Sequence, residues 1–385
     1  MACSKQITPK STPRRNAPAK VIKPRRKQLA PDLISDLSDC ILIHILSFLD
    51  AKEAVQTCIL SKRWINLWKT LPTLVLLNYP QLIDGNYEKF VHQVLSLRDN
   101  ATDIHSLQLH PTFFKRRCNS LVTRIMKYVF SHNVQHLLLS YQYFKPKCFS
   151  FSCSTLKSLR LTGGHFLLRV NTIFPNSLNF PSLSTLSLTY FTFSSNDDAC
   201  AKPFSTFDML NTLVINQCIV LNDRNLCISN TKLENLSITM YRDSYPGTFF
   251  EIELCAPNLR TFSLTSKHIS NFFGDKSIFS CVKQLSINVR CFDKYAQNSS
   301  ILLNWLNCFA NIEALTVDIA TLEVFLNFYN LFEVKPPSLV NLKSLKIETY
   351  HLLCVPPFDK VVNFLLQNSP SANVETIIVD KWSKM

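Results

Sequence analysis

The spacing of apolar residues predicts three helices between residues 32 and 72. The first is indicated by residues that share one helical face, namely Ile41, Leu42, Ile45, Leu46 and Leu49. Asp50 and Glu53 have the spacing of a capping box, which opens a second helix. A third helix begins near Ser61, and its apolar stripe consists of Trp64, Leu67, Trp68 and Leu71. Pro72 ends it, because the residue before a proline disfavours helical backbone.

The two tryptophans of the third helix have two interpretations. Basic residues lie between them, and a nucleic-acid surface combines cations for the phosphates with aromatic rings for the bases. However, the rings share their stripe with two leucines, whereas Lys62, Arg63 and Lys69 lie elsewhere on the helix. Base stacking needs rings exposed to solvent. The spacing therefore favours packing of both tryptophans in a core over contact with nucleic acid.

From residue 73 onward a different pattern recurs, in which an apolar residue is followed by others three and five positions later. Twelve matches are found, beginning at Leu71, Ile104, Val134, Leu156, Leu183, Leu210, Leu233, Leu259, Val282, Ile312, Leu342 and Val374. Successive matches begin 22 to 33 residues apart, close to the period of leucine-rich repeats. The match at Leu210 continues to Cys218, at the buried Cys or Asn position of such repeats.

Small or neutral polar residues dominate the position before the second apolar residue of each match, as in Ser158, Thr185 and Asn235. This filling predicts a short strand with one buried face and one face in water. Stacked units share a core that no single unit can form. If the wet face binds a partner, the candidate residues are Arg160, Ser187, Asn235, Ser263, Ser286 and Lys346. Serine and threonine also simply suit exposed strand positions, which is the competing explanation.

Composition excludes several classes of protein. The 385 residues contain only 5 glycines, and no phosphate-binding glycine motif can be built from them. The 14 cysteines include no CxxC pair, so no metal site or other cofactor is expected. The cysteines are instead expected to be free thiols in a reducing compartment. No apolar run is long enough to span a membrane. No hydrolase motif appears, although a dispersed triad would leave no local trace.

Most of the net charge of +14 lies in residues 1–31, which hold nine basic residues, five prolines and no acid. This segment is predicted to be a disordered basic arm. Its cluster from Lys23 to Lys27 is equally compatible with a nuclear-localisation patch and with a solvated tail. A third hypothesis, nucleic-acid binding through this arm, would rest on charge without sequence specificity.

Residues 32–72 resemble the F-box of the large plant F-box/leucine-rich-repeat family. The resemblance rests on the run from Asp32 through Ile34, Ser35 and Leu37 to the segment ILIHILSFL, followed by AVQTCILSKRWINLW. The repeats, and the ending FLLQNSPSA, are similar to the same family more loosely. The fold expected is therefore an α/β repeat. A disordered arm (1–31) precedes a three-helix F-box (32–72), and a leucine-rich-repeat solenoid with a curved parallel sheet and about 11–12 irregular units (73–385) follows.

The resemblance implies a non-catalytic subunit of an SCF-type (Skp-cullin-F-box) ubiquitin ligase. In such a subunit the F-box binds a Skp-type adaptor, which links it to a cullin, and the repeats bind a substrate protein for ubiquitination. By position, the adaptor contacts are expected from Leu37, Ser38, Ile41, Leu42, Ile45, Leu49, Val55 and, in part, Trp64. The expected location is the nucleus, the cytoplasm or both, with no membrane partner.

Two residues depart from the family pattern. Ser38 stands where the family usually has proline, and Cys40 stands where an acidic residue is usual. The change at Ser38 removes a rigid apolar contact, worth about 1 kcal/mol by area. The alternative function is therefore a leucine-rich-repeat interaction scaffold that does not enter a ligase.

Overall fold

The structure is a computed structural model that describes residues 34, 36–77, 86–110, 119–141, 152–163, 172–175, 178–194, 200–221, 225–240, 251–267, 272–273, 279–289, 296–326, 333–349 and 358–379. The predicted basic arm, residues 1–31, lies outside these residues. The chain divides into two compact units, Met1–Ser38 and Asp39–Met385. All named helices and strands belong to the second unit.

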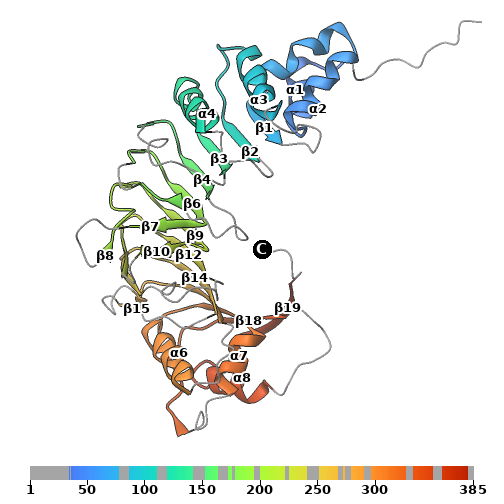
Figure 1. The fold of residues 1–385 in the computed structure, drawn as a ribbon. Helices are drawn as coiled ribbons and strands as arrows, with labels where there is room; N and C mark the ends of the chain where they lie inside the picture. The colour runs from blue at the N-terminus through green and yellow to red at the C-terminus, as the bar shows by residue number, and fades with distance from the viewer. Residues whose placement is uncertain are drawn as a thin grey trace, which may run out of the picture. The chain divides into compact units, whose positions relative to one another are not determined.

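Short helices open this unit (Figure 1). They are α1 (Asp39–Leu46), α2 (Ala51–Gln56) and three 3-10 segments, η1 (Thr57–Ile59), η2 (Lys62–Ile65) and η3 (Leu67–Thr70). The predicted capping box at α2 is confirmed. The Asp50 carboxylate accepts hydrogen bonds from the N–H groups of Lys52 and Glu53 at 2.9 and 3.0 Å, and the Glu53 carboxylate accepts from the Asp50 N–H at 3.3 Å.

The predicted third helix is not a continuous α-helix. Its residues form η2 and η3, which meet at Asn66, where φ is −112°. The Ser61 side chain makes no capping hydrogen bond, and the Trp64 N–H instead donates to the Ser61 carbonyl in a 3-10 turn at 3.1 Å. The prediction of packing is nevertheless confirmed, because all four stripe residues are buried, namely Trp64, Leu67, Trp68 and Leu71.

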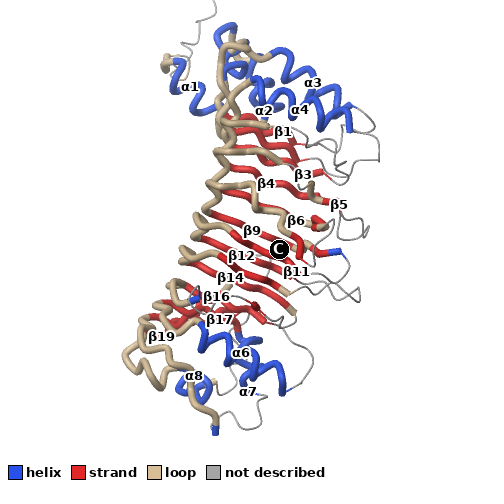
Figure 2. Tube along the Cα trace, turned by 90° about the vertical axis from the view of Figure 1, so that its left-hand side faces the viewer, coloured by secondary structure: helices blue, strands red, loops and turns tan. Residues whose placement is uncertain are grey.

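A sheet of twelve parallel strands follows, and its strands lie side by side in chain order, although strands of other sheets come between some of them in sequence (Figure 2). In order the strands are β1 (Thr73–Leu77), β2 (Ser106–His110), β3 (His136–Tyr141), β4 (Ser158–Gly163), β6 (Thr185–Thr189), β9 (Thr212–Asn216), β12 (Asn235–Met240), β14 (Thr261–Ser266), β16 (Gln284–Val289), β17 (Ala314–Asp318), β18 (Ser344–Thr349) and β19 (Asn373–Ile378). The molecule therefore consists of N-terminal helices and then a large parallel sheet, an α/β arrangement.

One backbone contact recurs at the start of these strands. The carbonyl of Lys157 accepts hydrogen bonds from the N–H groups of both Ser184 and Thr185, at 2.9 and 3.0 Å. The same two-donor contact is made by Pro72, His105, Gln135, Lys157, Ser184, Asn211, Glu234, Arg260, Lys283 and Glu313. Each of these carbonyls fixes where the next strand begins, so neighbouring strands start in the same register.

The predicted alternation of buried and wet positions is confirmed for the first eleven matches. Each strand from β1 to β18 pairs with its neighbours in the register that the pattern implies, such as Leu159 opposite Leu186. All three apolar positions in each of these matches are at most 9% exposed. Cys218 is also buried, and its thiol lies 3.6 Å from the Leu188 carbonyl oxygen.

The twelfth match is wrong in register. The sequence pattern aligns Ile377 with Leu345, whereas the structure pairs Leu345 with Val374. Strand β19 is exposed along almost its whole length, and Val374 is 43% exposed. Burial of one face is what specifies strand register, and this strand lacks a buried face.

A second layer lies on one side of the long sheet (Figure 2). It contains α3 (Asn86–Leu97) and α4 (Asn119–Ser131) near one end, and α6 (Ala296–Cys308) and α7 (Ile319–Leu326) near the other. Between them are two small parallel sheets, β10-β7-β5 and β15-β13-β11-β8. Their strands are β5 (Thr172–Ile173), β7 (Phe191–Phe193), β8 (Cys200–Ala201), β10 (Ile219–Val220), β11 (Asn225–Ser229), β13 (Ile252–Cys255) and β15 (Phe272–Phe273).

The last helix is α8 (Asp359–Leu365), which precedes β19. In the described part of the chain, no helix has both the length and the apolar character needed to cross a bilayer.

Fully buried phenylalanines fill the space between the layers near β7. The rings of Phe174 and Phe191 meet edge to face with centroids 5.7 Å apart, and those of Phe193 and Phe204 do so at 5.4 Å. These are favourable geometries for aromatic pairs. Gly163, at the end of β4, lies so close to this cluster that a Cβ atom there would be 2.8 Å from the Phe191 ring.

Candidate functional site

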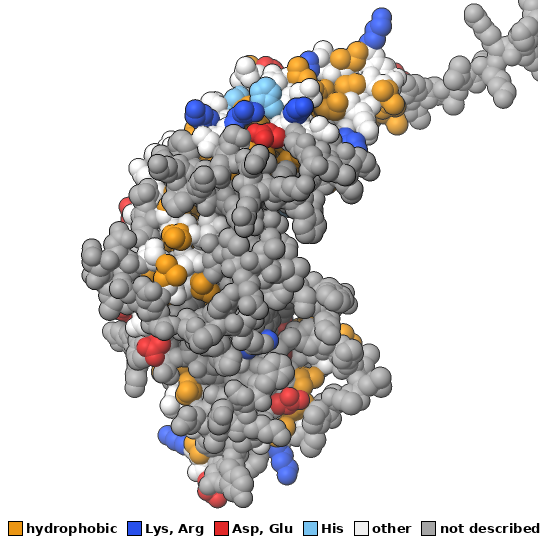
Figure 3. Space-filling model, viewed as in Figure 1, with side chains coloured by type: hydrophobic (Ala, Val, Ile, Leu, Met, Phe, Trp, Pro, Cys, Tyr) orange, Lys and Arg blue, Asp and Glu red, His pale blue; other side chains and the backbone are white. Residues whose placement is uncertain are grey.

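Exposed apolar side chains gather on the N-terminal helices (Figure 3). Ile41 and Ile45 lie one helical turn apart on α1 and are 46% and 41% exposed, while Phe48, just after the helix, is 76% exposed. The Phe48 ring packs edge to face on His44, with centroids 5.0 Å apart. Beyond α2 the exposed residues are Ile59, Leu60 and Ile65. We call these six residues the apolar helical surface; apolar residues gathered at a surface commonly mark a partner site.

The core beneath this surface is made by the adjacent side of α1, so the predicted single apolar face is divided into a buried part and an exposed part. Leu42 and Leu46 are fully buried, and α1 contacts η3 while α2 contacts β1. Arg63 of η2 forms an ion pair with Asp39 at the start of α1, with Nη2 2.6 Å from Oδ1. Both partners are partly exposed, so this pair adds little stability but ties η2 to α1.

The predicted adaptor contacts divide by burial. Ile41 and Ile45 are exposed, Leu49 and Val55 are half-buried, and Leu42 and Trp64 are buried. In the first unit, Leu37 is half-buried and Ser38 is exposed. The buried pair can support the apolar helical surface from below without forming it. Binding by any of these residues stays a prediction.

Sequence reasoning missed four members of the apolar helical surface, namely Phe48, Ile59, Leu60 and Ile65. Phe48 lies in the F-box run quoted above, but its exposure could not be inferred from a helical stripe because α1 ends at Leu46. The other three lie in or beside 3-10 segments. A period of 3.6 residues does not apply to a 3-10 helix, so the residue spacing gives no signal.

The predicted substrate residues come together on the wet face of the long sheet. Strand pairing places Arg160 opposite Ser187, and Ser263 opposite Ser286. The complete row, here called the central row, is Val75, Gln108, Leu138, Arg160, Ser187, Val214, Ser237, Ser263, Ser286, Thr316, Lys346 and Glu375. One face of the twelve strands therefore presents a continuous and mostly neutral line.

The predicted residues differ in their availability along this face. Arg160 is exposed, whereas Ser187 is only 9% exposed. Lys346 forms an ion pair with Glu375 at 3.8 Å. Asn235 lies on the adjacent row, and its side-chain amide donates hydrogen bonds to the Asn211 and Thr212 side chains, both at 3.2 Å. Arg160 is thus the candidate most accessible to a partner.

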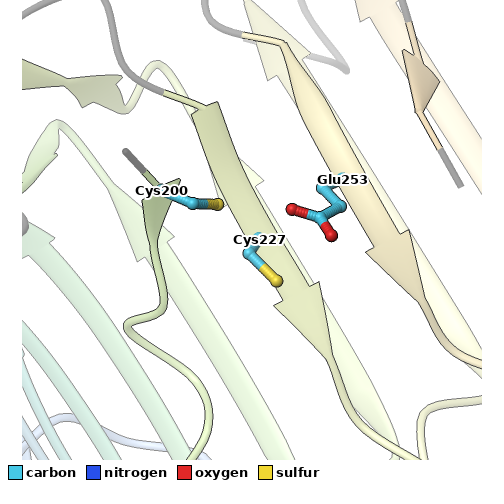
Figure 4. A group of neighbouring side chains, drawn as sticks. All are labelled: Cys200, Cys227 and Glu253. Carbon is cyan, nitrogen blue, oxygen red and sulfur yellow. The ribbon is translucent and has the colours of Figure 1, made fainter. Parts of the chain in front are cut away.

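One group of side chains in the described part of the chain is suited to hold a metal ion. Cys200, Cys227 and Glu253 come from β8, β11 and β13, and their ligand atoms lie within 4.8 Å of one another. Figure 4 shows the Cys200 thiol and the Glu253 carboxylate pointing toward each other across β11. Neither a CxxC pair nor any other local spacing marks these residues, because each lies on a different strand.

Comparison with known proteins gives a match to the F-box domain over residues 34–76. An FBD-associated F-box protein of Arabidopsis thaliana is 24% identical over 344 residues, which are 83% of this chain and 72% of the relative. F-box/LRR-repeat protein 13 of the same organism is 25% identical, covering 91% of this chain and 77% of its own length. A further Arabidopsis F-box/LRR-repeat protein is 26% identical over 92% of this chain and 73% of the relative.

Proposed function

We propose that this chain is the substrate-recognition subunit of an SCF-type ubiquitin ligase. It carries an F-box domain, and its homologues are named F-box/LRR-repeat and FBD-associated F-box proteins, as expected for a plant F-box/LRR protein. The apolar helical surface is the observation that carries this proposal, because it lies within the matched F-box residues. It would bind a Skp-type adaptor, and through it a cullin.

The N-terminal segment would act as a three-part F-box, in which η2 and η3 take the place of a third helix. The twelve parallel strands would form a leucine-rich-repeat solenoid. The recurring two-donor carbonyl contact supports this, because it repeats at the start of ten successive strands, from β2 to β18. A solenoid presents one continuous face to a partner. The central row would then bind the substrate protein, with Arg160 as its accessible charged group.

The proposed mechanism needs no catalytic residue in this chain. A receptor that holds both adaptor and substrate converts their encounter into an intramolecular event, which raises the effective concentration of the substrate. The transfer of ubiquitin is then carried out by other subunits. The nucleus, the cytoplasm or both would be the place of action.

Co-purification of the full chain with a Skp-type adaptor tests this proposal. We expect the wild type to bind and Ile41→Ala/Ile45→Ala to bind about 30-fold more weakly, since each truncation removes about 1 kcal/mol of burial. Ile173→Ala is the matched control, because Ile173 is 44% exposed on β5, outside the F-box, and should leave binding unchanged.

Equal adaptor binding by wild type and the double variant, or none by wild type, would remove the ligase proposal. The second outcome would favour an interaction scaffold, which the exposed Ser38 and Cys40 make a specific alternative. Restoring Ser38→Pro should strengthen adaptor binding if the ligase proposal is right. Deletion of residues 1–31 should not change it.

A further inference from the structure

We propose that Cys200, Cys227 and Glu253 bind a zinc ion that links three strands of the second layer. The three residues occupy β8, β11 and β13, which are neighbours in one parallel sheet. In sequence they are separated by 27 and 26 residues, close to the repeat period. A residue that recurs at the repeat period is brought beside its counterpart when the units stack. Stacking is thus what assembles this group from residues distant in sequence.

The geometry fits a tetrahedral ion. A zinc–sulfur bond of about 2.3 Å puts two thiolate ligands of one tetrahedral ion about 3.8 Å apart. The present ligand atoms lie within 4.8 Å of one another, so small side-chain rotations are sufficient to close the site. Strand pairing places Cys227 directly opposite Glu253, and the start of β11 opposite Cys200. The backbone already holds all three ligands on adjacent strands.

The chemistry of the donors selects the metal. Two thiolates favour zinc or copper(I) over magnesium and calcium, which prefer sites made of oxygen ligands only. The carboxylate favours zinc over copper(I), because copper(I) is the softer ion. Three protein ligands leave a fourth position of the tetrahedron for water. The proposed site lies on short strands of the second layer. A bound ion there would link neighbouring repeats and stabilise them.

Burial and the neighbouring acidic groups disfavour the anionic forms of both thiols, and a bound cation would offset this cost. Cys227 is only 6% exposed, and Cys200 is half-buried. Burial, together with the neighbouring Cys227 and Glu253, raises the pKa of the Cys200 thiol to about 12. Burial also raises the pKa of the Cys227 thiol, with Glu253 raising it further, while the hydrogen bond with Cys200 lowers it.

Cobalt(II) is the probe for the experiment, because its thiolate complexes absorb light and zinc displaces it. We titrate the full chain under reducing conditions and record the thiolate-to-cobalt charge-transfer band. One equivalent should bind and be displaced by one equivalent of zinc. Cys200→Ser and Cys227→Ser should abolish the band. Glu253→Gln should weaken binding about 10-fold or more, since loss of even a hydrogen-bond partner of a metal ligand costs that much.

Two control variants separate this site from the other thiols and acids of the chain. Cys281→Ser removes an exposed thiol, and Glu323→Gln removes an exposed carboxylate on α7, and neither should change the titration. Glu253 is accessible to solvent on β13, so its variant should fold even if Cys227→Ser does not. The absence of a thiolate band in the parent chain, or an unchanged titration of Glu253→Gln, would overturn the site.

Discussion

Phe191 leaves no room for a side chain at residue 163. A Cβ atom there would meet the ring at 2.8 Å, closer than such contacts occur in proteins. The ring cannot easily retreat, because Phe191 is fully buried and packs edge to face on Phe174. One of only five glycines is therefore placed where a buried ring lies against the backbone of the long sheet.

Gly163→Ala should lower the free energy of unfolding by about 1–3 kcal/mol, the usual cost of overpacking a core. Urea denaturation followed by circular dichroism measures the change. In the presence of Phe191→Leu the cost of Gly163→Ala should become smaller, because the shorter side chain makes room. Additive effects of the two changes would show that the contact is not the cause.

Trp64 can be separated from the lysines that surround it. Trp64→Ala removes a buried ring and should cost about 3–5 kcal/mol, and it should also weaken adaptor binding because the apolar helical surface loses its support. Lys62→Gln/Lys69→Gln should change both quantities little. Denaturation and adaptor co-purification on the same samples would test this. Loss of nucleic-acid binding in the lysine variant, with stability unchanged, would contradict the packing interpretation.

At the level of single residues, the sequence predicts what repeats and misses what depends on distant contacts. The tryptophan stripe was predictable because spacing alone places it on one side. The role of Arg98 was not predictable. This residue is 4% exposed and donates a hydrogen bond of 2.7 Å to the Leu71 carbonyl. That contact joins residues 27 positions apart, and no local pattern encodes it.

Among the elements, α2 depends on its cap because it has only six residues. Asp50 satisfies two of its first N–H groups, and Glu53 returns a contact to the Asp50 N–H. So short a helix gains little from propagation and needs its ends satisfied.

Asp50→Ala should therefore lower the free energy of unfolding by about 0.5–2 kcal/mol. Asp50→Asn is the control, since asparagine caps nearly as well and should lose much less. Thermal unfolding and hydrogen exchange of the α2 amides measure the global and local effects. Equal losses for the two variants would indicate that charge, not capping, is what Asp50 contributes.

The strands of the long sheet were the most predictable elements, because burial of every second residue specifies both their existence and their register. The exception, β19, shows the reason, since it has no buried face and its register differed from the pattern. The prediction of a continuous third α-helix was wrong for a related reason. Apolar spacing predicts which residues are buried, but it does not distinguish an α-helix from consecutive 3-10 turns that bury the same side chains.

At the scale of the whole molecule, β19 is the last strand of the twelve-stranded sheet. Its Val374 and Ile378 are 43% and 55% exposed. An apolar edge strand is a site for pairing between chains, and charged residues oppose such pairing.

We therefore expect the full chain to self-associate as concentration rises, and Ile378→Lys to reduce this without lowering the unfolding midpoint. Analytical ultracentrifugation over a wide range of concentrations measures the association. Met209→Lys is the control, because Met209 is 52% exposed and lies outside the strands. A parent chain that stays monomeric throughout would show that this edge does not pair.

The arrangement of whole surfaces was only partly predictable. The central row followed from the repeat pattern, because equivalent positions stack in register. The group of Cys200, Cys227 and Glu253 did not, since its residues belong to the second layer, where no pattern had been recognised. The repeat period contained the signal, but many residue pairs share that period, and only the strand pairing shows which of them meet.

The carbonyl contact at the start of the strands also has a consequence for the evolution of such a sequence. It joins neighbouring units at one point, and the intervals between matches vary from 22 to 33 residues while the first eleven strands stay in register. Insertions and deletions in the segments that connect successive strands of the long sheet therefore do not shift the central row. Lengthening a loop costs little free energy, because closure entropy grows only slowly with length. The two surfaces of the sheet can therefore diversify independently, one by substitution and the other by changes in length.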